Sequence, residues 1–220
     1  MSLEVIEFES APNPTASIII LHGLGADGND FVPIAQELDL ASVGPVRFVF
    51  PSAPTRPVTI NGGYLMRAWY DILGTEVARR EDEAGLRASQ AQIEALIANE
   101  RARSVKANRI VLAGFSQGCA MTFMAGLRHG ERLAGLLGMS GYLPLADLTA
   151  TERSAANADV PIFQAHGSAD PMITMARATA SRDALIALGY PVEWHAYPMP
   201  HSVCPQEIVD MNRWLLRVLA

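Results

Sequence analysis

The stretch Gly114-Phe115-Ser116-Gln117-Gly118 (GFSQG) places a serine between two glycines at G-x-S-x-G spacing. A serine hydroxyl is a weak nucleophile unless it stands clear of the backbone and close to a base. A sharp turn from a strand into a helix exposes the side chain in this way, and glycines two residues to either side remove the Cβ atoms that would clash. The motif therefore predicts a strained turn at Ser116, with a strand before it and a helix after it.

The segments that flank the motif are of the required types. Residues 109–113 read RIVLA, an apolar run suited to a strand that is buried on both faces. Residues 117–128 read QGCAMTFMAGLR; they are mostly apolar, contain no proline and are followed by Gly130, which can end a helix. The five residues alone do not distinguish a nucleophilic serine from an ordinary strand–turn–helix connection. The flanking segments favour the nucleophilic serine.

Length and composition indicate an ordinary folded chain. It has 220 residues, of which 50% are hydrophobic and 18% charged, so we expect one domain, residues 1–220, with a sizeable core. A net charge of −6 and the lack of a basic run argue against nucleic-acid binding. The N-terminal residues do not resemble a signal peptide, and no apolar run is long enough to span a bilayer. We therefore expect a cytoplasmic protein without stable membrane insertion.

Strand-like and helix-like segments alternate along the chain. We expect strands at residues 17–21, 46–50, 109–113, 133–139, 161–165 and 191–197, and helices at residues 30–40, 81–100, 117–128, 174–188 and 205–219. This alternation predicts an α/β fold with a mostly parallel, doubly wound sheet and helices on both faces. The first helix is expected to be capped by Asn29 or Asp30. Residues 3–9 (LEVIEFE) alternate with period two and predict an antiparallel edge strand.

A second glycine-rich stretch follows the strand that is expected at residues 17–21. Residues 23–28 (GLGADG) fit the G-x-G-x-x-G fingerprint of dinucleotide-binding folds. That fingerprint needs a carboxylate about 20 residues later to hold a ribose, but residues 48–54 (FVFPSAP) contain none. The glycines suit another role better, because a loop after an early strand can aim a backbone N–H at a developing oxyanion. The second donor would be the N–H of Gln117, at the N-terminus of its helix.

In this kind of fold the catalytic residues follow one another along the chain in the order serine, acid, histidine. This order limits the candidates for the partners of Ser116. Asp170 comes just after an expected strand, at the carboxyl end where open α/β sheets place their sites. Only two histidines follow it: His195 lies inside an expected strand, whereas His201 lies in the proline-stiffened loop at residues 198–205 (PMPHSVCP). We therefore favour His201 as the base, with Asp170 orienting it, and expect His22 and His166 to shape loops.

Neither a metal nor a cysteine is expected to take part in catalysis. No set of histidines and carboxylates has the helical spacing of metal ligands, so no metal and no other cofactor is predicted. Cys204 lacks the strand–turn–helix that would expose it, and Cys119 should point from its helix into the packing. Small buried thiols are the favoured interpretation of both cysteines.

Five motifs, in this order, resemble the carboxylesterase and acyl-protein thioesterase (phospholipase/carboxylesterase) family of α/β-hydrolases. They are HGLGADG (22–28), APTRPVTINGGY with RAWYD (53–71), GFSQG (114–118), HGSAD (166–170) and PMPH (198–201), and they span nearly the whole chain. The resemblance implies an α/β-hydrolase fold, catalytic Ser116, Asp170 and His201, and oxyanion amides from Leu24 and Gln117. It also implies ester hydrolysis and a homodimer. Cys119 and Pro200 depart from the family pattern, which usually has glycine at both positions.

Three functions remain open. The favoured one is a serine esterase that cleaves carboxylic esters of short to medium acyl chains through an acyl-enzyme. The second is an acyl-protein thioesterase or lysophospholipase, whose substrate would be a thioester, an acylated protein or a lipid. The third is a catalytically silent α/β-hydrolase domain used for binding, against which the complete set of catalytic residues argues.

The substrate site is expected to be an open groove without a cap domain. The 21 residues between Met139 and Pro161 are too few for a substantial cap, and residues 51–81 are expected to form a loop beside the site. The apolar side chains available to line the groove are Leu65, Trp69, Met172, Ile173 and Val203.

Overall fold

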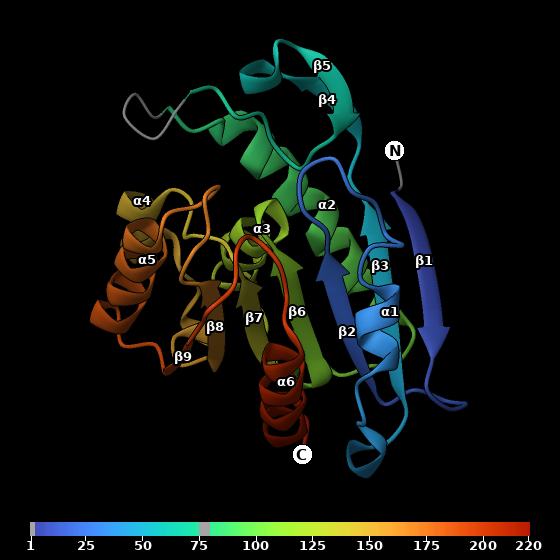
Figure 1. Cartoon of the computed structure of the whole chain (residues 1–220). Coiled ribbons are helices and arrows are strands. Elements are labelled where there is room, and N and C mark those ends of the chain that lie inside the picture. The colour runs from blue at the N-terminus through green and yellow to red at the C-terminus, as the bar shows by residue number, and fades with distance from the viewer. Residues whose placement is uncertain (1–2, 75–79) are drawn as a thin grey trace.

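A computed structural model describes residues 3–74 and 80–220 (Figure 1). The strands are β1 (Glu4–Glu9), β2 (Ala16–Leu21), β3 (Val46–Ser52), β4 (Thr55–Val58), β5 (Tyr64–Arg67), β6 (Ile110–Phe115), β7 (Gly135–Met139), β8 (Ile162–Gly167) and β9 (Val192–Tyr197). The α-helices are α1 (Val32–Gln36), α2 (Glu83–Ala102), α3 (Gln117–Gly126), α4 (Ala146–Glu152), α5 (Met175–Ala187) and α6 (Pro205–Val218). Short 3₁₀ turns occur at η1 (Ala41–Val43), η2 (Thr59–Asn61), η4 (Ala107–Arg109) and η5 (Ala155–Asn157).

Seven strands form one sheet in the order β1-β3-β2-β6-β7-β8-β9. Every neighbouring pair is parallel except β1 and β3, which are antiparallel, so the expected parallel sheet with an antiparallel edge strand is confirmed. In the register of β2 with β6, Leu21 lies opposite Gly114. The loops that follow these two strands therefore leave the sheet side by side at its carboxyl edge, where parallel α/β sheets carry their sites.

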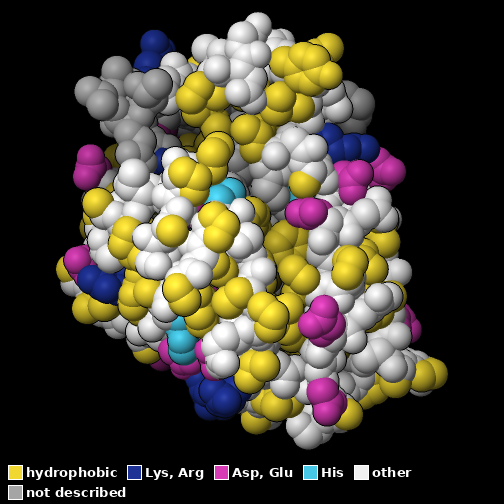
Figure 2. All heavy atoms as spheres, in the orientation of Figure 1, with side chains coloured by type: hydrophobic (Ala, Val, Ile, Leu, Met, Phe, Trp, Pro, Cys, Tyr) yellow, Lys and Arg dark blue, Asp and Glu magenta, His cyan; other side chains and the backbone are white. Residues whose placement is uncertain are grey.

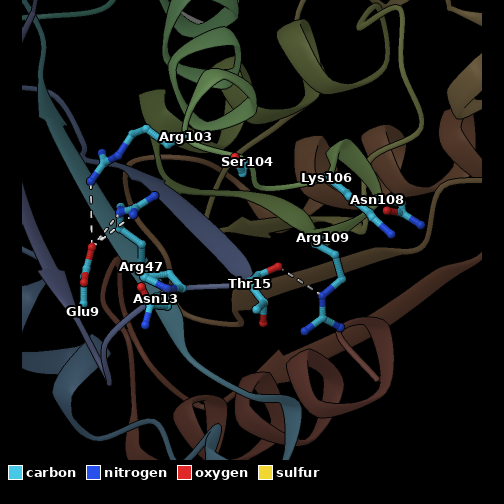
Figure 3. Close-up of a pocket in the computed structure, with 10 residues that line it drawn as sticks. Glu9, Asn13, Thr15, Arg47, Arg103, Ser104, Lys106, Asn108 and Arg109 are labelled. Atoms are coloured by element: carbon cyan, nitrogen blue, oxygen red, sulfur yellow. Dashed lines mark hydrogen bonds and ion pairs between the residues drawn. The ribbon is translucent and has the colours of Figure 1, made fainter.

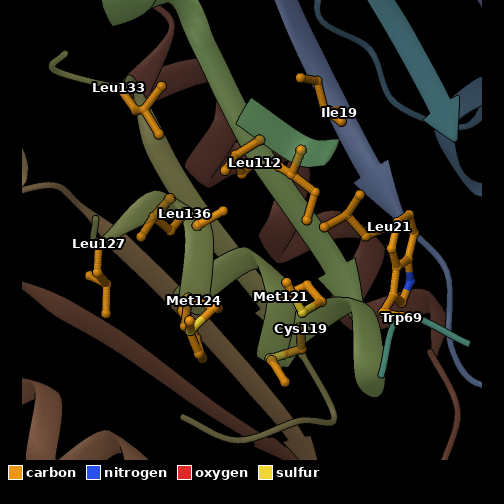
Figure 4. Packing of buried hydrophobic residues seen from close by; sticks show 14 of the residues in the cluster. Ile19, Leu21, Trp69, Leu112, Cys119, Met121, Met124, Leu127, Leu133 and Leu136 are labelled. Carbon is orange, nitrogen blue, oxygen red and sulfur yellow. The ribbon is translucent and has the colours of Figure 1, made fainter. Parts of the chain in front are cut away.

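Two hydrophobic cores fill the space between the sheet and the helices on its two faces. Along β2, Ile19 and Leu21 point into one core and Ile18 and Ile20 into the other, which is why the strand is apolar at every position. The first core is completed by α2, α3 and α5, and Figure 4 shows side chains of α3 packed against β2, β6 and β7. The second is completed by α1 and α6.

Helix α2, which the sequence predicts at residues 81–100, is amphipathic. Asp82 caps its N-terminus by accepting a hydrogen bond from the Gly85 N–H at 2.9 Å. Its apolar residues Leu86, Ile93, Leu96 and Ile97 are all buried. Within residues 3–74 and 80–220, no helix combines the length and the apolar character needed to cross a membrane.

Helix α1 is shorter than the sequence indicates. We expected residues 30–40 with Asn29 or Asp30 as the cap, but the helix covers Val32–Gln36 and Phe31 occupies the cap position without a side-chain hydrogen bond. The Asp27 carboxylate instead accepts a hydrogen bond from the Asn29 N–H at 2.8 Å. An aspartate side chain that accepts a hydrogen bond from the backbone two residues later favours a turn over a helix.

The segment between β3 and α2 was expected to be a loop and instead contains a β-hairpin. Strands β4 and β5 pair with each other alone, so the hairpin stands apart from the main sheet at its carboxyl edge (Figure 1). Gly62 and Gly63, at the tip, both have positive φ values, of 66° and 78°. Between β7 and β8 the chain forms α4 and η5, and no cap domain is present within the described residues, as expected.

Candidate active site

The turn at Ser116 has the strained geometry that its flanking glycines predict. Ser116 has φ 56° and ψ −115° and connects β6 directly to α3. A Cβ atom on Gly114 would lie 2.3 Å from the Gly118 backbone, and one on Gly118 would lie 2.0 Å from the Leu21 carbonyl oxygen. Neither approach leaves room for a side chain, so both positions require glycine. The strand, the helix and the exposing turn are therefore all present.

Asp170 and His201 form a short hydrogen bond although 31 residues separate them. The His201 Nδ1 lies 2.6 Å from the Asp170 Oδ2, and the other carboxylate oxygen accepts the backbone N–H groups of Met172 and Ile173 at 2.8 and 3.0 Å. The Asp170 side chain is fully buried, whereas 18% of the His201 side chain is exposed. Because the carboxylate can only accept, Nδ1 carries the proton and Nε2 remains available as a base.

Ser116 and His201 line one cavity of about 420 Å³ at the carboxyl edge of the sheet. Leu24 and Gln117, the expected oxyanion donors, line the same cavity. The His201 ring also packs against Phe115, the residue before the serine, with ring centroids 4.6 Å apart. On this face of the molecule, histidine atoms are visible among mostly hydrophobic side chains (Figure 2). The structure thus brings together residues from the loops after β2, β6, β8 and β9.

The loop that carries Leu24 is held by the ring of His22. The His22 Nδ1–H donates to the Gly23 carbonyl at 2.6 Å, and Nε2 accepts the Ala53 N–H at 2.9 Å. Burial lowers the pKa of His22, which favours the neutral ring that this bonding pattern requires. The indole N–H of Trp69 donates to the His22 carbonyl at 2.9 Å. These contacts confirm His22 as a loop-shaping residue.

His166 has a comparable role beneath Asp170. Its Nε2 donates to the Ile173 carbonyl at 2.9 Å and lies 3.6 Å from the Asp170 Oδ2. Burial lowers the pKa of His166, which favours a neutral ring, so His166 brings no positive charge to the Asp170 carboxylate. This arrangement confirms the expectation that His166 shapes a loop.

The side chain of Gln117 has a structural function that sequence reasoning missed. Its Oε1 accepts the Trp69 N–H at 3.0 Å and its Nε2 donates to the Tyr70 carbonyl at 3.0 Å. The segment after β5 is thereby attached to the first turn of α3, beside Ser116. The only signal in the sequence is a glutamine at the start of a helix that is otherwise apolar, because a buried amide needs partners.

Only two of the five side chains expected in the groove line the cavity, namely Met172 and Ile173. Trp69 is fully buried in the first core, where its indole N–H donates to the His22 carbonyl. Leu65 lies on the exposed hairpin, and Val203 packs against the second core. The expectation for these three residues is therefore wrong. Side chains that line the cavity and were not foreseen include Ile60, Asn61, Tyr70, Ile72, Tyr142 and Arg177.

The rival candidates for the nucleophile and the base lie outside this cavity. Cys119 is fully buried, and burial raises the pKa of its thiol far above the usual range, which disfavours the reactive thiolate. Cys204 occupies the cap position of α6. The His195 Nε2 lies 3.0 Å from a Glu193 carboxylate oxygen, and its ring stacks on Phe163 at 4.8 Å. None of these three side chains lines the cavity that Ser116 and His201 share.

A larger cavity of about 830 Å³ lies at the opposite edge of the sheet (Figure 3). Arg47, in its wall, forms ion pairs with Glu9 at 3.0 Å and with Glu100 at 2.8 Å. Arg109 donates to backbone carbonyls, among them that of Val43 at 2.7 Å. Its described lining residues include no histidine, and these two arginines already have partners. The smaller cavity is therefore the better candidate for catalysis.

Comparison with known proteins gives one consistent result. The sequence model of the phospholipase/carboxylesterase family matches residues 2–219. The chain is 40% identical to acyl-protein thioesterase 1 of Yarrowia lipolytica over 206 residues, 91% of each chain. The crystal structure of Arabidopsis thaliana SOBER1 superposes with a TM-score of 0.88 at 29% identity, covering 93% of this chain and 99% of that one. For Zea mays acyl-protein thioesterase 2 the TM-score is 0.86 at 28% identity, with 98% and 99% covered.

These matches confirm the family and the α/β-hydrolase fold that the five sequence motifs imply. The family match extends over nearly the whole chain, and the solved structures share its mostly parallel sheet and flanking helices. The chain therefore belongs to the phospholipase/carboxylesterase family of α/β-hydrolases, and it is an esterase-type hydrolase.

Proposed function

We propose that the protein is a serine hydrolase that cleaves carboxylic esters of short to medium acyl chains with Ser116, His201 and Asp170 as its triad. The observation that carries the proposal is the 2.6 Å contact between His201 Nδ1 and Asp170 Oδ2, made by a histidine that lines the same cavity as Ser116. An imidazole oriented in this way is the base that a serine nucleophile needs.

The proposed reaction proceeds through an acyl-enzyme. The Ser116 hydroxyl attacks the acyl carbonyl while His201 Nε2 takes its proton, and Asp170 stabilises the imidazolium that results. The backbone N–H groups of Leu24 and Gln117 stabilise the tetrahedral oxyanion. His201 then protonates the leaving alkoxide or thiolate, and a water molecule repeats the sequence on the acyl group. No step in this sequence requires a metal or another cofactor.

A second candidate function is removal of acyl groups from proteins through thioester cleavage. It is supported by the 40% identity to a protein named acyl-protein thioesterase 1. Side chains at the cavity rim also favour a bulky substrate, because Met172 and Ile60 are 69% and 47% exposed. Apolar surface of this kind can receive the remainder of an acylated peptide.

The assignment of Ser116 is tested by labelling and kinetics. A fluorophosphonate probe should label the wild type and fail to label Ser116→Ala, whose kcat we expect to fall by about 10⁵- to 10⁶-fold. Ser168→Ala is the matched control, because this exposed serine lies two residues from Asp170 and outside the cavity. If Ser116→Ala retained a tenth of the wild-type activity, Ser116 would not be the nucleophile.

Chain length and leaving group separate the two candidate functions. Each buried CH₂ contributes up to about 0.8 kcal/mol, so kcat/KM for p-nitrophenyl esters should rise from acetate to medium chains and then level off. An S-acylated peptide with the preferred acyl chain should be cleaved as well if acylated proteins are substrates. A preference for acetate without cleavage of the peptide would leave a small-ester hydrolase only.

A further inference from the structure

A guanidinium group lies in the wall of the catalytic cavity. Arg177 belongs to the first turn of α5 and lines the cavity together with Ser116 and His201. Its Cζ atom lies 3.1 Å from the centre of the Tyr142 ring, so the guanidinium covers that ring. Stacking of this kind occupies one face of the group and does not use its N–H donors, which lie in the plane.

Arg177 has no carboxylate partner within residues 3–74 and 80–220. Arg182, on the same helix, shows the alternative arrangement. Its guanidinium also faces an aromatic ring, that of Trp194 at 5.1 Å, but it pairs with Asp183 at 2.7 Å and lies outside the cavity. The positive charge of Arg182 is therefore balanced by the protein itself, whereas the positive charge of Arg177 faces the space that a substrate would occupy.

The remaining lining makes the Arg177 side of the cavity the one suited to an anion. Tyr70 and Tyr142 join their hydroxyl groups at 2.5 Å there, and each lines the cavity. Among the described lining residues, the other charged one is Asp30, which is exposed and lies in the loop after β2. Helix α5 and that loop lie on opposite sides of α3 (Figure 1). A negative group on the substrate is thus attracted to one wall and repelled by the other.

We propose that Arg177 binds a carboxylate of the substrate, so that the preferred esters or thioesters carry a carboxylate in addition to the scissile carbonyl. The planar N–H fork of arginine matches the two oxygens of a carboxylate, and its single positive charge balances the single negative charge. This inference rests on the proposed hydrolase function and specifies its substrate class. The carboxylate can belong to the acyl part or to the leaving group, and the experiment distinguishes these two.

The first experiment compares substrates of equal length that differ in charge. In the acyl arm, kcat/KM is measured for mono-p-nitrophenyl adipate and for p-nitrophenyl hexanoate. In the leaving-group arm, 4-carboxyphenyl butyrate is compared with 4-carbamoylphenyl butyrate. We expect the wild type to prefer the carboxylate in one arm by about tenfold or more, as a charge-assisted hydrogen bond predicts. Equal values of kcat/KM within both pairs would overturn the inference.

The second experiment assigns the preference to Arg177. Arg177→Met should lower kcat/KM for the preferred carboxylate substrate by about 10- to 100-fold and change that of its neutral counterpart by less than about threefold. Arg177→Lys should fall between the two, because it keeps the charge and loses the fork. Arg182→Met is the control and should change neither value. Equal losses on both substrates in Arg177→Met would show a structural role instead.

Binding measurements test this inference independently of the proposed catalysis. In the Ser116→Ala background, calorimetry is used to compare monomethyl adipate with methyl hexanoate, and 4-carboxyphenyl butyrate with its carbamoyl analogue. Tighter binding of a carboxylate ligand that disappears with Arg177→Met supports the inference, even if the wild type turned over no ester and the proposed function failed. Hydrolysis of neutral esters with no carboxylate preference in rate or binding would overturn the inference and leave the proposed function intact.

Discussion

Glu207 is a buried acid whose titration should make the stability of this protein fall as the pH rises from about 4.5 to about 8. The residue lies in the first turn of α6, is completely buried, and neither of its carboxylate oxygens has a hydrogen-bond partner among the described residues. Burial raises the pKa of Glu207 to about 8, against smaller opposition from the nearby Cys204 backbone N–H. The positive end of a helix stabilises a carboxylate by about 1 kcal/mol, too little to offset desolvation of this size.

The magnitude follows from proton linkage. The pKa of the Glu207 carboxyl is near 4.5 in the unfolded chain and about 8 in the folded protein. Between these values the unfolded state releases the proton and the folded state retains it, so the free energy of unfolding falls as pH rises. The slope is about 1.4 kcal/mol per pH unit, which amounts to about 5 kcal/mol in total, and the loss saturates above the folded pKa.

Glu207→Gln isolates this effect, because the amide has the shape of the protonated acid and does not titrate. Urea unfolding followed by circular dichroism at pH 5, 6, 7, 8 and 9 gives the free energy of unfolding for both proteins. We expect similar stability at pH 5 and an advantage for the variant that grows by several kcal/mol up to pH 8. Glu131→Gln, which removes an exposed carboxylate paired with Arg101, is the control for lost charge. A wild-type–variant difference that stays constant from pH 5 to 9 would refute the reasoning.

Three further predictions concern the site and its support. His201→Ala should lower kcat by about 10⁵-fold or more and His195→Ala by far less, measured with one chromogenic ester; the reverse order would transfer the role of base to His195. Gly118→Ala should destabilise the fold by about 3 kcal/mol, since its Cβ would meet the β2 backbone at 2.0 Å, whereas Gly130→Ala meets nothing within 4 Å; equal urea midpoints would contradict this. Gln117→Ala should reduce kcat/KM about tenfold or more by releasing the segment after β5, and a variant with unchanged kinetics would show that the two hydrogen bonds do not position the site.

The sequence was sufficient for the features that depend on local geometry and chain order. The turn at Ser116 is predicted by spacing alone, because the clashes that exclude side chains at Gly114 and Gly118 arise wherever a strand enters a helix so sharply. Alternation of apolar strands and helices predicted the parallel sheet. Parallel strands bring their carboxyl ends to one edge, so Asp170 and His201 could be placed together from their positions after two strands.

Contacts between segments far apart in the sequence were decided by the tertiary structure. Trp69 was expected in the groove, but its indole N–H donates a hydrogen bond to the carbonyl of His22, 47 residues away in the sequence, and the ring is buried. Likewise, nothing in the local pattern indicates that the Gln117 side chain supports the segment after β5. The charge of Arg177 became informative only through the packing of α5, which places this residue in the wall of the cavity that Ser116 also lines. Periodicity tells which face of an element is buried, whereas the partner that meets a given polar group depends on how all the elements pack.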